Sequence, residues 1–222
     1  MIRFSLILFL LFSPLVFAKE KSPQGLIEDF SKGMVGKLPV RFRTYPFQRG
    51  KAEKVYQIRK EGENGYLQAV DNRDLSVAIF REFSWDLKKY PMISWKWRAQ
   101  VLPEEGDERF GPNQKNDSAC GVYVIFGKYS GRALKYVWST LAPVGTVVHK
   151  KENLFIFVKN SGTSEKGSWQ DVHVNVLEDY KKVFGQEPSN PTGIGFLTDG
   201  NATHTPAACD YDTFILESPH AS

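Results

Sequence analysis

The chain has 222 residues, of which 41% are hydrophobic and 14% aromatic, and its formal net charge is +4. This length suits one domain whose core is large enough to fold without a structural metal. The 29 basic and 25 acidic residues do not give the dense basic face that nucleic-acid binding requires, so we expect no nucleic-acid partner.

The first eighteen residues have the pattern of a secretory signal peptide. Arg3 supplies a positive start, residues 6–12 are apolar, and Ala18 is the small residue that precedes a cleavage site. The apolar run is too short to span a membrane, and no later segment supplies a span. We therefore expect an exported protein, periplasmic rather than extracellular, with residues 19–222 as its single domain. The alternative for this segment is a buried N-terminal helix, and the oligomeric state stays open.

Short segments of β-branched and aromatic residues, bounded by Gly, Pro, Asn and Asp, dominate the rest of the chain. About eleven such segments, with one short helix, predict an all-β sandwich of the jelly-roll type. In chain order they are residues 26–30, 54–59, 66–70, 77–83, 92–101, 121–126, 133–139, 154–159, 172–176, 193–198 and 213–216.

Residues 92–101 alternate between apolar and polar side chains. Trp95 and Trp97 share the face that we expect to enter the core, and Arg98 lies on the opposite face. Three other tryptophans are less constrained by pattern, and any of them could supply a platform on which a sugar stacks: Trp85, Trp138 and Trp169.

The helix is predicted near residues 176–184. Asn175 can cap its start, Glu178 follows three residues later, and Gly185 fits the left-handed position that ends a helix.

Charge is unevenly placed along the chain. Residues 37–60 hold eight Lys or Arg and one acidic residue, Glu53. We interpret this stretch as solvated surface, with contact to an anionic polysaccharide, a lipid headgroup or an assembly partner as the alternatives. Residues 102–118 are predicted to be a surface loop. Its acidic residues are expected to form a solvated run rather than the acid pair of a glycosidase: Glu104, Glu105, Asp107 and Glu108.

Two cysteines, Cys120 and Cys209, each lie beside a predicted strand. In an oxidising compartment an even number of cysteines favours a disulfide, and the alternative is two separately buried thiols.

The segment from Thr198 to Asp212 is the strongest binding candidate, because it concentrates polar side chains in a predicted loop after an apolar strand. Arg98 is expected either to pair with Asp117 or to bind a carboxylate or phosphate. The predicted ligand-binding residues are Arg98, Asp117, Asp199, Asn201, Thr203 and His204. The alternative is a long polar turn in which Asp and Asn satisfy backbone groups.

No motif for nucleophilic, nucleotide-dependent or zinc-dependent catalysis occurs in the sequence, and the histidines have no metal-ligand spacing. We therefore name no catalytic residue and expect no cofactor.

Several short segments together carry a family resemblance: residues 90–98 with 102–103, 116–119, 122–124, 134–138, 179–180, 184–185, 198–203 and 211–212. Over most of the mature domain the chain resembles the domain-of-unknown-function 3047 family (DUF3047) of exported bacterial proteins. The resemblance implies an exported β-sandwich and supplies no catalytic residues.

A looser similarity is to jelly-roll carbohydrate-binding modules, which often open and close on aspartate-bearing strands, as residues 28–30 and 210–212 do. In those modules both strand ends often lie near a structural calcium. We attribute the aspartates to ordinary turn chemistry, in which Asp side chains bond nearby backbone amides, with a calcium site as the alternative. We thus expect a non-catalytic β-sandwich that binds a glycan or another cell-envelope ligand. The alternatives are a carbohydrate-active hydrolase or lyase on the same sandwich, and a structural partner in the envelope.

Overall fold

The computed structural model describes residues 25–111, 114–127 and 131–219. The predicted signal peptide lies outside these described residues. Within them, no helix is both long enough and apolar enough to cross a membrane.

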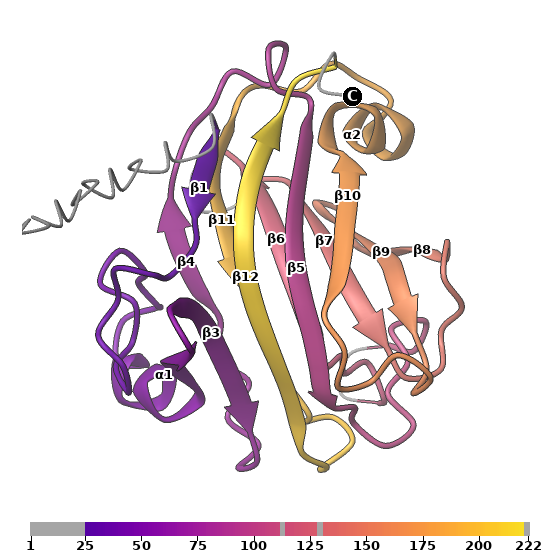
Figure 1. Ribbon diagram of the computed structural model, residues 1–222. Coiled ribbons are helices and arrows are strands. Elements are labelled where there is room, and N and C mark those ends of the chain that lie inside the picture. Colours follow the sequence, from indigo (N-terminus) through magenta and orange to yellow (C-terminus); the bar gives the residue numbers. More distant parts are fainter. Residues whose placement is uncertain (1–24, 112–113, 128–130, 220–222) are drawn as a thin grey trace, which may run out of the picture.

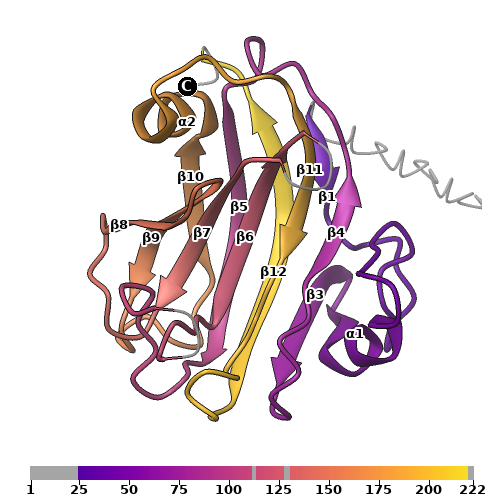
Figure 2. The ribbon, with the colours of Figure 1, turned by 180° about the vertical axis from the view of Figure 1, so that it is seen from behind.

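Two six-stranded sheets pack face to face as a β-sandwich (Figures 1 and 2). Sheet A contains β1 (Leu26–Glu28), β2 (Tyr56–Glu61), β3 (Asn64–Asp71), β5 (Met92–Val101), β10 (Gln170–Asn175) and β12 (Ala207–Glu217). Sheet B contains β4 (Ile79–Glu82), β6 (Cys120–Phe126), β7 (Ala133–Ser139), β8 (Val147–Lys151), β9 (Leu154–Ser161) and β11 (Pro191–Phe196).

The strand orders are β10-β5-β12-β3-β2, with β1 also paired to β12, and β4-β11-β6-β7-β9-β8. The pair β7–β9 is parallel, and the other named pairs are antiparallel. The predicted jelly-roll β-sandwich is confirmed. It has one strand more than expected, because the alternating segment that forms β8 lay inside a predicted connection.

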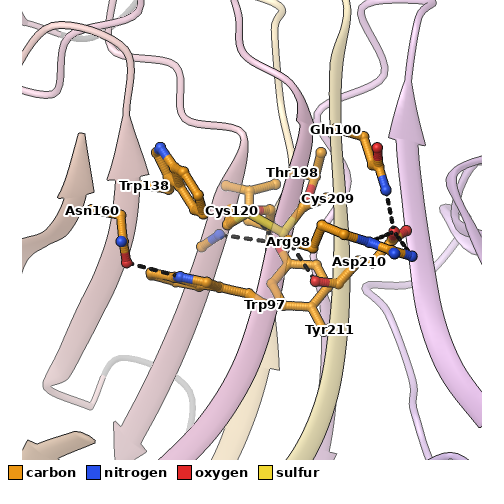
Figure 3. The surroundings of a disulfide bond; sticks show 12 residues. Trp97, Arg98, Gln100, Cys120, Trp138, Asn160, Thr198, Cys209, Asp210 and Tyr211 are labelled. Atoms are coloured by element: carbon orange, nitrogen blue, oxygen red, sulfur yellow. Dashed lines mark hydrogen bonds and ion pairs between the residues drawn. A yellow bond between two sulfur atoms is a disulfide. The ribbon is translucent and has the colours of Figure 1, made fainter. Parts of the chain in front are cut away.

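Aromatic side chains fill the space between the sheets. Trp95 and Trp97 are both buried there, as their shared face predicted. The ring of Trp95 stacks on Phe214 of β12 with centroids 6.0 Å apart. Figure 3 shows Trp97 and Arg98 on opposite sides of β5, with Trp97 directed toward the core and Arg98 away from it.

A disulfide joins Cys120 of β6 to Cys209 of β12 and therefore links sheet B to sheet A (Figure 3). The predicted bond is confirmed. It connects residues 89 positions apart, and a cross-link over a loop of that length stabilises a fold by about 4.6 kcal/mol in the chain-entropy account.

Helix α2 (Val176–Phe184) begins and ends where the sequence predicted. The Asn175 side chain accepts a hydrogen bond from the Glu178 amide at 3.0 Å, and Gly185 has φ 66°. A second helix, α1 (Arg49–Val55), was not predicted. It occupies the start of a predicted strand, it has no side-chain cap, and its apolar residues are too few to give a helical period.

The predicted polar loop from Thr198 to Asp212 is corrected in part. Its second half belongs to β12, because Cys209 and Tyr211, which enter the core, alternate with Ala208 and Asp210, and this stretch pairs with β3 and β5. The polar connection therefore ends at residue 206, and the aspartates after it lie on the outer face of sheet A.

Candidate functional site

The outer face of sheet B is the side of that sheet turned away from the sandwich core. In β11, Ile194 and Phe196 enter the core, so Gly193 and Gly195 lie on the outer face. A Cβ atom on Gly195 would stand 2.5 Å from a ring carbon of Phe80. Because this glycine has no side chain, the Phe80 ring can lie directly against the sheet.

A row of aromatic rings crosses this face. Tyr45 precedes α1, Phe80 belongs to β4, and Tyr123 belongs to β6. The Tyr45 and Phe80 ring centroids are 5.4 Å apart, and those of Phe80 and Tyr123 are 6.5 Å apart. Tyr45 is 60% exposed, and the other two rings are half-buried. These rings are accessible from solvent, unlike the tryptophans of the core.

The row borders a hollow of about 460 Å³, which we call the sheet-B hollow. Its lining combines aromatic and aliphatic side chains with the polar side chains of Lys151 and Asn153: Tyr45, Ala78, Phe80, Tyr123, Ile125, Gly131, Ala133, Lys151, Asn153 and Leu154. A concave, largely apolar surface with a few polar groups is the usual form of a small-molecule or cofactor site.

A buried ionic cluster lies beside Tyr123 on the same face. Lys135 of β7 donates to Glu108 at 2.8 Å, and its ammonium lies 5.7 Å from the centre of the Tyr123 ring. Lys150 of β8 donates to the carbonyl oxygens of Glu108 and Phe110. The predicted solvated acidic run is therefore wrong in part, because Glu108 and its neighbour in sequence, Asp107, are both buried and ion-paired.

Asp199 completes the cluster from the end of β11. One carboxylate oxygen accepts from the Ser76 hydroxyl at 3.1 Å, and the other is buried without a hydrogen-bond partner in the described structure. Burial raises the pKa of Asp199 to about 7; Glu108 and Asp117 add to the rise, and Lys135 opposes it.

The same environment shifts the pKa values of the neighbouring side chains. Burial and the nearby carboxylates of Asp199 and Glu108 raise the pKa of Tyr123 to about 12, with Lys135 opposing. Burial also works against the charge on Lys135, but Glu108 outweighs it and the pKa of Lys135 is raised. Tyr123 is thus a neutral hydroxyl and Lys135 a cation throughout the physiological range.

Two of the predicted site residues hold a loop beside this cluster. Both carboxylate oxygens of Asp117 are occupied: one accepts from the Ala202 amide, and the other accepts from the amide and the hydroxyl of Thr203. A backbone bridge between Ser118 and Asp199 fixes the position of Asp199 beside the loop. Asp117 and Thr203 therefore position Asp199.

The remaining predicted residues lie further out. His204 is exposed and contacts Asp74 through Nδ1 at 3.0 Å, and Asn201 lies on the same loop, half-buried. Arg98 is not part of this group, because it lies on the outer face of sheet A. The structure thus brings Asp117, Asp199 and Thr203 together and leaves Arg98 apart. A ligand-binding role for the six residues stays a prediction.

Arg98 pairs with residues other than Asp117. Its guanidinium contacts Asp210 at 2.8 Å and Glu61 at 2.6 Å, and it lies 4.5 Å from the centre of the Trp169 ring (Figure 3 shows the Asp210 contact). Trp169 is half-buried, so it keeps an accessible edge. Trp85 and Trp138 are buried, which corrects the expectation that either could serve as an accessible platform.

The residues at the strand ends do not form a calcium site. Glu28 contacts Arg81 at 2.9 Å, Asp212 accepts from Asn64, and Asp210 faces Arg98. Calcium needs six to eight converging oxygens, whereas these carboxylates are directed at separate nitrogen donors. Among the described residues there is no cluster of three or more metal-ligating side chains.

Sequence reasoning missed Tyr45, Phe80 and Tyr123 as surface residues. A signal for them was present in β11, where glycines alternate with Ile194 and Phe196 and so mark a sheet face without side chains. The burial of Glu108 had no comparable signal, since its partner Lys135 comes from a distant strand.

Fold and site together define a jelly-roll β-sandwich with a cross-sheet disulfide and a hollow on one outer face. The chain belongs to the family described as "Protein of unknown function (DUF3047)", whose model matches residues 40–215. The resemblance drawn from sequence segments is thereby confirmed. No curated protein matches the chain in sequence.

Several solved structures show a distant similarity. The carbohydrate-binding module TmCBM61, in complex with β-1,4-galactotriose, is 7% identical with a TM-score of 0.37, over 86% of this chain and 99% of that one. The endoglucanase Cel12A from Rhodothermus marinus is 9% identical with a TM-score of 0.44, over 80% and 92%. TmCBM27, a carbohydrate-binding module studied for mannan recognition, is 12% identical with a TM-score of 0.32, over 86% and 95%. These values do not define a shared site.

Proposed function

We propose that the protein is an exported, non-catalytic binding protein that holds a glycan of the cell envelope in the sheet-B hollow. In this proposal residues 1–18 are removed as a signal peptide, and residues 19–222 act as one β-sandwich domain in the periplasm. The cross-sheet disulfide supports export, because such bonds persist in oxidising compartments.

The observation that carries the proposal is the aromatic row. Tyr45, Phe80 and Tyr123 stay partly exposed on a sheet whose other face already packs a full aromatic core. Sugar rings have apolar C–H faces that stack on aromatic rings, while their hydroxyls need hydrogen-bond partners. The hydroxyl of Tyr45 and the ammonium of Lys151 offer such partners at the edge of the hollow.

Affinity electrophoresis in gels that contain cell-envelope polysaccharides tests the proposal. We expect retardation of the wild-type protein in at least one gel, and its loss in Tyr45→Ala and Tyr123→Ala. Trp169→Ala is the matched control, because it removes a partly exposed aromatic ring from the other sheet. Retardation lost in Trp169→Ala and kept in Tyr45→Ala would place the site on sheet A, and no retardation in any gel would overturn the proposal.

The buried carboxylates favour a second candidate function, a carbohydrate-active hydrolase or lyase. Asp199 has a raised pKa, as the acid of an active site does, and Glu108, which is ion-paired to Lys135, is the second carboxylate. Both side chains are covered in this structure, so catalysis would require the cover to move. This function predicts release of reducing ends from a bound polysaccharide, and loss of that release in Asp199→Asn with retained binding.

A further inference from the structure

We propose that the flank formed by residues 31–55 docks the protein on a membrane surface that contains anionic lipids. This inference does not rest on the glycan site. The flank adjoins the sheet-B hollow through Tyr45, but the residues that carry the inference lie outside the lining of the hollow, and the ligand chemistry is different.

The flank is an ordered part of the sandwich. Backbone bridges join Val35 to Ile58 of β2 and Arg43 to Phe80 of β4, so the segment covers the edge strand of each sheet on one side of the molecule (Figures 1 and 2). Helix α1 closes the segment and buries Ala52 and Val55 against β2 and β3. Its surface side chains are therefore held on a fixed frame.

Large apolar side chains project from this flank into solvent. Val40 is 93% exposed and Phe47 is fully exposed, and Met34 and Val35 are more than half exposed. Phe47 has φ 65°, a conformation that costs a bulky residue free energy. At Phe47 the chain thus has both a strained backbone and an apolar ring that projects into solvent.

Cations surround these apolar groups. The exposed basic residues of the segment are Lys32, Lys37, Arg41, Arg43, Arg49, Lys51 and Lys54. The only acidic residue within 31–55 is Glu53, which forms an ion pair with Arg49 at 2.9 Å. Outside the segment, Glu82 of β4 lies 3.8 Å from Arg43. The flank therefore carries a net positive charge.

Exposed aromatic and aliphatic side chains surrounded by Lys and Arg are typical of proteins that lie on a membrane surface. The apolar side chains enter the boundary of the acyl region, and the cations remain at the level of the lipid phosphates. An anionic polysaccharide would use the charges and leave Val40 and Phe47 in water. The exposed apolar side chains therefore favour a lipid surface over an anionic polysaccharide as the binding partner of the flank.

Co-sedimentation with vesicles tests the apolar contribution. The disulfide-bonded protein without residues 1–18 is mixed with vesicles of phosphatidylcholine, or of phosphatidylcholine with phosphatidylglycerol. We expect sedimentation with the second kind only, weakening as salt is added, and a loss of roughly tenfold in affinity for Phe47→Ser. Phe110→Ser is the matched control, because Phe110 is also exposed but lies outside the flank.

Charge reversal tests the electrostatic contribution. Arg41→Glu with Lys51→Glu should abolish sedimentation, while Lys88→Glu with Lys166→Glu, equal in charge but outside the flank, should retain most of it. Binding that both double variants lose equally, or that Phe47→Ser leaves unchanged, would overturn the docking mode. Absence of sedimentation together with pull-down of a protein partner would do the same in favour of an assembly role. Retardation by polysaccharide is measured on the same variants and should not change, which separates this test from that of the glycan site.

Discussion

The two outer faces of the sandwich hold their charges differently. On sheet A the charged groups differ in exposure: Arg98 joins the buried Asp210 to the half-exposed Glu61, whereas Lys96 of β5 and its partner Asp171 of β10 are both about half exposed. On sheet B the charges of Lys135, Glu108 and Asp199 are buried, and aromatic rings take the accessible positions.

The difference follows from what covers each face. Residues 102–111 and 140–146 cover part of the outer face of sheet B. Glu108 accepts from Lys135 of β7, and Ala142 packs with Val137 and Ile156 in a second small apolar cluster. Charges beneath that cover must find partners within the protein, since water cannot solvate them. The uncovered remainder of sheet B forms the hollow. Sheet B thus offers a ligand an open hollow beside its covered charges, whereas the outer face of sheet A is lined by ion pairs of differing exposure.

The two faces should differ most in the free energy of unfolding that is lost when one cation is removed from each. Lys135→Met leaves Glu108 and Asp199 buried without their shared cation, and we expect it to cost about 3–5 kcal/mol in the free energy of unfolding. Arg98→Met should cost about 1–3 kcal/mol, because Glu61 is half exposed and can be hydrated, and Gln100 still donates to Asp210. Urea unfolding with the disulfide intact measures both.

A double variant separates the missing charge from the lost packing of the lysine stem. Lys135→Met with Glu108→Gln should recover part of the stability, because it removes one of the carboxylates left without a cation. Equal losses for Lys135→Met and Arg98→Met would mean that the two faces do not differ in how they hold charge.

The raised pKa of Asp199 should make the free energy of unfolding depend on pH, and we expect this effect to be of intermediate size. The folded state takes up a proton at about pH 7, and the unfolded chain does so at about pH 4. Since the folded pKa is the higher one, the contribution of Asp199 to the free energy of unfolding should be greatest below pH 4, fall between about pH 4 and pH 7, and level off above.

Asp199→Asn removes this dependence, because the amide stays neutral. Relative to the wild type, the variant should be more stable above pH 7, by on the order of 1–3 kcal/mol, and nearly equal near pH 4. Thermal unfolding across that range measures the difference. Asp117→Asn is the contrasting variant, since Asp117 accepts three hydrogen bonds as a carboxylate, and it should destabilise the protein near neutral pH. A constant advantage of Asp199→Asn at every pH would contradict the raised pKa.

Much of the fold could be predicted because its signals are local. The alternation in residues 92–101, the Asn175 cap and Gly185 each depend on a few neighbouring residues, and each has the predicted structural role. The disulfide was predictable from the number of cysteines and the exported context. Helix α1 was not, because its packing against β2 and β3 rather than its own periodicity stabilises it.

The site was less predictable, because it depends on contacts between distant strands. Lys135 and Glu108 meet only once β7 lies beside residues 102–111, and the Phe80 ring is placed by a glycine more than one hundred residues away. The start of the polar connection after β11 was located correctly, whereas its predicted end was wrong because residues 207–212 belong to β12. The direction of its side chains depends on Asp117, which lies in another part of the sequence.

The smallest contrast concerns the solvated pair on sheet A. Lys96 contacts Asp171 at 3.1 Å, and both side chains are about half exposed, so we expect Lys96→Ala to change the free energy of unfolding by less than about 0.5 kcal/mol. Urea unfolding at low and at high salt measures this, and the change should shrink further as salt is added. A loss well above this value would mean that the pairs on sheet A act as a connected network. The two faces would then differ in their access to water rather than in how strongly their charges stabilise the fold.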